Sequence, residues 1–128
     1  MSIAITRGVK VEVESEYLPD RSDVERGYYF FAYHVKITNE GDEPVQLLSR
    51  HWIITDGNGK VEEVRGAGVI GEQPVIEPGE SHQYSSFCPL ETSVGSMQGT
   101  YQMVTESGES FDAEIAPFRL AYEKELLH

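Results

Sequence analysis

Basic residues are scarce in this sequence. Its 128 residues include 22 acidic and only 10 basic side chains, which gives a formal net charge of −12 and an isoelectric point of about 4.6. General nucleic-acid binding and attachment to an anionic membrane surface both need clustered lysine and arginine. The charge balance therefore predicts no nucleic-acid partner and no anionic membrane partner.

Cysteine and long hydrophobic runs are also scarce. Cys88 is the only cysteine, so an internal disulfide is excluded. The first residues lack the apolar stretch of a signal peptide, and no run approaches the roughly 20 apolar residues of a membrane span. We therefore expect no membrane insertion and a cytoplasmic location, where a lone thiol stays reduced.

The chain does contain regular alternation of apolar and polar residues. Val9, Val11 and Val13 alternate with charged residues, and the aromatic stretch 28–38 is apolar at every second position. With 39% hydrophobic residues, the length suits one globular domain over residues 1–128. No helical period is sustained, and only residues 121–127 could form a turn or two of helix. The pattern predicts an all-β sandwich or barrel of about seven to eight strands, over residues 9–17, 28–38, 45–55, 60–65, 81–87, 99–105 and 110–115.

The strand predicted over residues 45–55 has an irregular pattern. Its apolar phase shifts between Leu47 and Leu48, which indicates a bulge or a strand that changes sheets. Trp52 is the only tryptophan and is expected in the core, so alternation places Arg50 on the same face and His51 on the opposite one. Both are candidates for a partner surface. The alternatives are an ion pair for Arg50 and a solvated or hydrogen-bonded imidazole for His51.

Two aromatic residues fall on the side of their strand opposite the apolar stripe. Tyr28 and Phe30 would form an exposed patch there, and adjacent exposed aromatics are typical of a protein-binding surface. The alternative is that the neighbouring loop over residues 18–24 covers them. The sequence therefore predicts an unknown protein partner, bound through a surface drawn from Tyr28, Phe30, Arg50 and His51.

A glycine-rich segment follows the strand predicted over residues 60–65. Gly66, Gly68 and Gly71 match G-x-G-x-x-G, but the prolines that follow prevent the helix which a dinucleotide fold requires. Loop amides together with Arg65 could still hold a small anionic ligand such as a pyrophosphate group. The alternative is that the glycines only permit a tight loop.

Clusters for metal or catalytic chemistry are not evident. The four histidines form no H-x-H or H-x₃-H pair, and Cys88 has neither a C-x₂-C partner nor an evident histidine partner. The acids at positions 12, 14 and 16 are interpreted as the solvated face of a strand. We therefore expect no catalytic residue, no metal site and no cofactor.

Blocks across most of the chain resemble the ApaG family. They are LLSRHWIITDGNG at 47–59, VRGAGVIGEQP at 64–74, PGES at 78–81 with YSSFCPL at 84–90, and GSMQGTYQMV at 95–104. The resemblance implies one ApaG domain with a fibronectin type III-like, immunoglobulin-like antiparallel β-sandwich, in a bacterial cytosolic protein.

The same resemblance implies a biological setting. The family is associated with cobalt resistance and magnesium efflux, its gene often neighbours that of a diadenosine-tetraphosphate hydrolase, and its domain recurs in F-box and polymerase-interacting proteins of eukaryotes. We therefore expect a non-enzymatic binding module that acts through a protein partner or a small ligand in divalent-cation homeostasis. The alternative is a sensor that binds a nucleoside polyphosphate or pyrophosphate at the Gly66–Gly71 loop.

Overall fold

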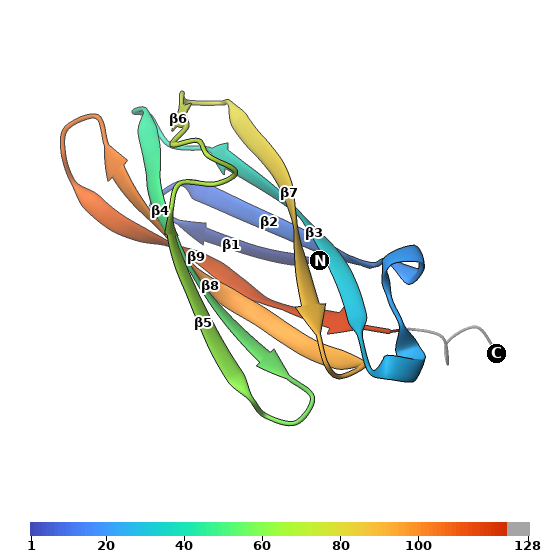
Figure 1. Ribbon diagram of the computed structural model, residues 1–128. Helices are drawn as coiled ribbons and strands as arrows, with labels where there is room; N and C mark the ends of the chain where they lie inside the picture. Colours follow the sequence, from blue (N-terminus) through green and yellow to red (C-terminus); the bar gives the residue numbers. More distant parts are fainter. Residues whose placement is uncertain (123–128) are drawn as a thin grey trace.

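The computed structural model describes residues 1–122, and two antiparallel β-sheets make up nearly all of this part (Figure 1). The possible helical turn over residues 121–127 lies almost wholly outside the described residues. Two short 3₁₀ turns, Pro19–Arg21 and Val24–Arg26, form the polar break between the second and third strands. Within residues 1–122, no helix is long and apolar enough to cross a membrane.

Within residues 1–122, nine strands form the two sheets. The four-stranded sheet has the order β1-β2-β3-β7, and the five-stranded sheet has the order β5-β4-β8-β9 with β6 paired to β4. The bounds are β1 Ser2–Thr6, β2 Val9–Tyr17, β3 Tyr29–Asn39, β4 Val45–Asp56, β5 Val61–Ala67, β6 Val75–Ile76, β7 Ser81–Leu90, β8 Val94–Thr105 and β9 Ser110–Ala121. The predicted all-β, fibronectin type III-like antiparallel sandwich is confirmed.

The core lies between the two sheets, and alternation along each strand fills it. Val9, Val11 and Val13 of β2 are buried, as are Phe31 and Ile37 of β3. On the other sheet the same alternation buries a second set, which consists of Leu47, Trp52, Met97, Tyr101, Met103, Ile115 and Leu120. The faces assigned from the sequence to the strands at residues 9–17 and 29–37 are therefore confirmed.

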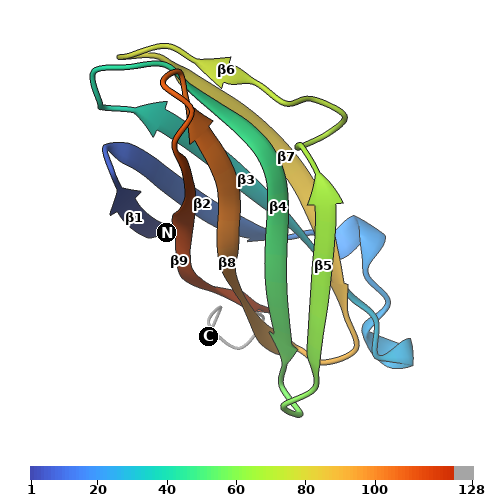
Figure 2. The ribbon, with the colours of Figure 1, turned by 90° about the vertical axis from the view of Figure 1, so that its left-hand side faces the viewer.

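The two sides of the sandwich differ. On one side β1 and β2 contact β9, where the Thr6 hydroxyl accepts a hydrogen bond from the Glu114 amide at 3.0 Å and Arg7 pairs with Glu109 at 3.0 Å. On the other side β5 and β7 are the edge strands of their respective sheets, and both lie on the right in Figure 2. Within residues 1–122 β5 and β7 make no comparable contact with each other, and a small cleft lies between them.

The bulge predicted in β4 is present. The pairing of β4 with β8 shifts register between Leu47 and Ser49. Before the shift, Val45 and Gln46 pair with β6, and after it residues 49–55 pair with β5. One extra residue thus lets a single strand serve two short partners in succession.

The sequence pattern did not reveal two of the strands. β1 has only five residues, and exposed Ile3 and Ile5 alternate with small side chains, so its apolar pattern faces solvent. β6 has two residues, and its existence depends on pairing with the far end of β4. Both strands are defined by a neighbour rather than by their own periodicity.

Gly99 of β8 should tolerate no side chain. A Cβ at this position would lie 2.0 Å from the main-chain oxygen of His51 in the paired strand β4. We expect Gly99→Ala to destabilise the protein by about 2 kcal/mol or more, because backbone must move to admit the methyl group. Gln98→Ala, one residue away on the exposed face, should change stability by about 0.5 kcal/mol or less. Urea unfolding of both variants measures the difference, and equal midpoints would contradict it.

Candidate functional site

Three aromatic rings and an arginine form a patch on the outer face of the four-stranded sheet. Tyr28 stacks on Phe30 with ring centroids 5.9 Å apart, and Phe30 stacks on Phe87 at 5.5 Å. The Arg21 guanidinium lies 5.3 Å from the Phe30 ring and 5.1 Å from the Phe87 ring. Phe87 is 50% exposed and Tyr28 is 41% exposed. We call Arg21, Tyr28, Phe30 and Phe87 the aromatic patch.

Strand register and a local loop build this patch. Phe87 of β7 is paired with Ala32 of β3, whose small side chain is buried although alternation points it outward. The loop before β3 is fixed to it, because the Phe30 amide donates to the Ser22 hydroxyl at 2.9 Å and Leu18 donates to the Phe30 carbonyl at 2.9 Å. Tyr28 and Phe30 are thus partly exposed and partly covered, and their role as a partner surface stays a prediction. The loop supplies Arg21 as a partial cover, and the aromatic edges stay exposed.

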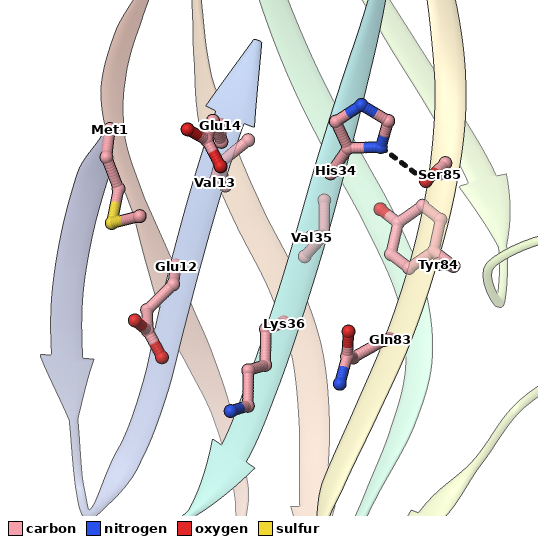
Figure 3. A pocket seen from close by; sticks show the side chains of 10 residues that line it. All are labelled: Met1, Glu12, Val13, Glu14, His34, Val35, Lys36, Gln83, Tyr84 and Ser85. Carbon is pink, nitrogen blue, oxygen red and sulfur yellow. Dashed lines mark hydrogen bonds between the residues drawn. The ribbon is translucent and has the colours of Figure 1, made fainter.

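A shallow depression lies on the same outer face. Its volume is about 520 Å³. Figure 3 shows its polar side chains side by side on β2, β3 and β7. Its polar side chains are Glu12 and Glu14 of β2, His34 and Lys36 of β3, and Gln83 and Ser85 of β7. The pair Ala32–Phe87 lies two residues along the ladder from the pair His34–Ser85, so the depression and the aromatic patch are neighbours on this face.

His34 joins the depression to the acidic strand β2. Its Nδ1 lies 2.6 Å from the Ser85 hydroxyl and its Nε2 lies 3.0 Å from the Glu16 carboxylate. Serine, histidine and glutamate occur in this order in hydrolytic triads, but a nucleophile also needs donors that stabilise a developing oxyanion. Ser85 lies within the β3–β7 ladder on an open sheet face, so the arrangement is that of a surface hydrogen-bond network.

Arg50 and His51 lie on the other sheet, on opposite faces of β4 as alternation predicts. The His51 Nε2 lies 2.7 Å from the Glu63 carboxylate, so His51 is the hydrogen-bonded imidazole that the sequence analysis gave as an alternative. Arg50 points between the sheets and donates from Nη1 to the carbonyls of Ala67 at 3.1 Å and Gly68 at 2.8 Å. In the described part of the chain it has no carboxylate within 4 Å. Neither residue joins Tyr28 and Phe30 in one surface.

The glycine-rich segment is tightly built. Gly66 is within β5, not in a loop, and a Cβ on buried Gly68 would lie 2.2 Å from the Glu72 carbonyl oxygen. The Gly68 amide donates to the Leu48 carbonyl at 2.8 Å, and Val69 and Glu72 exchange two main-chain hydrogen bonds. These contacts give the glycines a packing role. Gly71, with φ +75°, and the 73%-exposed side chain of Arg65 are the parts of the predicted anion site that stay open.

Buried hydroxyl and thiol groups lie between the sheets. The hydroxyls of Tyr84 and Tyr101 are hydrogen-bonded to each other, and burial raises the pKa of both above the usual value for tyrosine. Burial also raises the pKa of Tyr33, and it raises the pKa of the Cys88 thiol to about 11, with Glu62 adding to the effect. The sequence indicated a small buried Cys88, but it gave no sign that three tyrosines converge near Arg50.

Some site features were missed at the sequence level. Phe87 is central to the aromatic patch, and alternation from inward-facing Tyr84 would have placed it outward. Its contact with Phe30 required the β3–β7 register, which one sequence does not show. Residues 1–122 contain no group of three or more His, Cys, Asp and Glu side chains arranged to hold a metal ion.

The raised pKa values predict that stability falls at alkaline pH. Above about pH 9 the unfolded chain releases the Cys88 proton, whereas the folded chain keeps it up to about pH 11. The unfolded state then binds fewer protons, so the free energy of unfolding decreases by up to about 1.4 kcal/mol per pH unit for this group. The buried tyrosines add to the slope above pH 10.

Urea unfolding between pH 7 and pH 11 measures this effect. Cys88→Ala should make the slope between pH 9 and pH 10 shallower, and Tyr84→Phe should do so above pH 10. A wild-type stability that stays constant up to pH 11 would contradict the buried, protonated state of these groups.

Comparison with known proteins agrees with the sandwich just described. A family model described as the ApaG domain matches residues 19–105. The proteins named Protein ApaG from Azotobacter vinelandii and Aromatoleum aromaticum are 60% and 58% identical over 113 residues, with 88% of this chain and 90% and 89% of theirs covered. A crystal structure from Bordetella pertussis is similar with a TM-score of 0.89 at 51% identity, covering 91% of this chain and 94% of that one. The chain therefore belongs to the ApaG family.

Proposed function

We propose that this protein is a non-enzymatic binding module that recognises a protein partner through the outer face of its four-stranded sheet. The observation that carries the proposal is the aromatic patch, in which stacked rings remain exposed beside a shallow depression. Exposed aromatic side chains next to an arginine are the residue types that dominate binding energy at protein interfaces.

The charge around the patch indicates the chemistry of the partner. Glu12, Glu14 and Glu16 face outward along β2 beside the depression, in a chain of net charge −12. A complementary surface presents an apolar side chain to the rings of Phe30 and Phe87 and basic groups to the acidic strand. We therefore infer a partner with a basic and apolar contact surface.

Recognition rather than catalysis also agrees with the titratable groups. The single cysteine is buried, and its raised pKa disfavours the reactive thiolate. The Ser85–His34–Glu16 network lies on an open face that does not exclude water. In this proposal the protein acts in the cytoplasm. Its influence on cobalt and magnesium, which is associated with the ApaG family, is indirect and is exerted by the partner.

A second proposal is that the protein binds a nucleoside polyphosphate or pyrophosphate at the Gly66–Gly71 segment. In it, Arg65 and the open main chain at Gly71 contact a pyrophosphate group. Calorimetric titration with ADP, ATP and diadenosine tetraphosphate tests it, and Arg65→Gln should weaken binding while leaving the aromatic patch intact. Absence of heat in every titration would remove this alternative.

A site-specific photocrosslink tests the partner proposal. A photoreactive phenylalanine analogue replaces Phe87 in the full chain, and the cells are irradiated before lysis. We expect one adduct of defined mass, because Phe87 is half exposed at the centre of the patch. The same analogue at Val61, which is 58% exposed on the five-stranded sheet, is the matched control.

The protein identified in the adduct is then purified, and its affinity for this chain and its variants is measured. Phe87→Ala should weaken the affinity about tenfold or more, Glu14→Lys should weaken it through charge, and Val61→Ala should leave it within about twofold. A partner captured equally at both positions, or one indifferent to Phe87→Ala, would refute the proposed surface.

A further inference from the structure

A second candidate binding site lies between the sheets, on the side where the sandwich is open. A cleft of about 260 Å³ separates edge strands β5 and β7. Its floor includes Arg50 and Trp52 of β4 with Tyr33 of β3, and its walls include Val64 of β5 and Ser86 of β7. It opens on the side of the molecule where β5 and β7 lie in Figure 2 and is distinct from the depression in Figure 3.

Arg50 gives this cleft a positive charge with unused donors. The half-buried guanidinium uses only Nη1, for the carbonyls of Ala67 and Gly68, and its Nε and Nη2 groups have no acceptor within residues 1–122. Within residues 1–122 this guanidinium has no carboxylate within 4 Å, and an anion can bind its free N–H groups through charge-assisted hydrogen bonds.

Gly66 maintains the room for this guanidinium. A Cβ at position 66 would lie 2.7 Å from Arg50 Nη2 and 2.8 Å from Cζ, so any side chain there would displace the charge. Gly66 does not have a positive φ, so its backbone conformation does not by itself require glycine. The space that the arginine occupies accounts for this member of the glycine-rich segment.

Hydroxyl donors lie near the same charge. Tyr33 is close to the Ser86 hydroxyl, and its own hydroxyl, whose pKa burial raises above the usual value for tyrosine, is a neutral donor at pH 7. Arg50 is near enough to Tyr33 and Tyr84 to influence the ionisation of both. One end of the cleft thus offers a cation and neutral donors, which suits an oxyanion.

The remaining walls limit the ligand. Val64 and Pro89 present apolar surface above Trp52, which is only 2% exposed, whereas Glu62 adds a negative charge to the lining. The cleft is smaller than the about 300–1,000 Å³ typical of sites for drug-sized ligands. A small molecule with a single negative charge and an apolar body fits these conditions, and a multiply charged phosphate does not.

We propose that the cleft between β5 and β7 binds a small monocarboxylate with an apolar, ring-sized body, whose carboxylate pairs with Arg50 and whose body packs against Val64 and Pro89. This site is independent of the partner surface on the four-stranded sheet. The ligand is recognised by one bidentate ion pair with Arg50 and by apolar contact with the rest of the lining.

The single tryptophan provides a direct reporter. In ¹⁵N-labelled protein the Trp52 indole N–H gives one isolated NMR signal, and we follow it during titration with benzoate. We expect a saturable shift, with about tenfold weaker binding for the neutral isostere benzamide and no saturable shift with inorganic phosphate. A benzoate titration without saturation, or equal affinities for benzoate and benzamide, would refute the proposal.

Variants test the role of Arg50. Arg50→Gln should reduce benzoate affinity about tenfold or more, and Arg119→Gln, on exposed β9 at the opposite edge of the sheet, should leave it within about twofold. Gly66→Ala keeps the charge but displaces it, so it should also weaken binding even if Arg50→Gln fails to fold. Unchanged affinity in Gly66→Ala, or equal losses in Arg50→Gln and Arg119→Gln, would overturn the assignment.

Discussion

Trp52 packs between the two sheets against aromatic rings from both of them. Its ring centroid lies 5.2 Å from that of Tyr33 on the four-stranded sheet, and 6.1 and 5.9 Å from those of Tyr101 and Phe118 on its own sheet, all in edge-to-face contact. Such contacts contribute energy beyond burial alone and fix orientation. The alternation of β4 around this anchor then determines where Arg50 and His51 point, and hence which of them borders the interior cleft.

The two faces of the four-stranded sheet serve different purposes. The inner face supplies valines and aromatic rings to the core, whereas the outer face carries acidic strand β2, the His34 network and the aromatic patch. Ala32 shows how closely the two are connected, since its small side chain on the outer face lets Phe87 lie across β3. The proposed recognition surface is thus built on the same β3–β7 ladder that supplies side chains to the core.

Much of the fold followed from local pattern, and much of the site did not. The phase shift at Leu47 and Leu48 located the bulge, and alternation from Trp52 oriented Arg50 and His51, because both depend only on neighbours along one strand. The stacking of Phe87 on Phe30 and the convergence of tyrosines near Arg50 depend on register between strands far apart in sequence. The reason for glycine at position 66 was equally unpredictable, because it is the Arg50 side chain on the adjacent strand and not the backbone conformation of Gly66.

The closed side of the sandwich joins the first strand to the last, as the bond from Glu114 to Thr6 and the pair of Arg7 with Glu109 show. During synthesis β1 leaves the ribosome long before its lateral neighbour β9, because Thr6 and Glu114 are 108 residues apart in the sequence. The β1–β2 and β2–β3 pairings involve nearby segments and can form while translation continues. Closure of the core on that side must wait until β9 has emerged, so the apolar inner face of β2 stays open to water, or to a chaperone, until then.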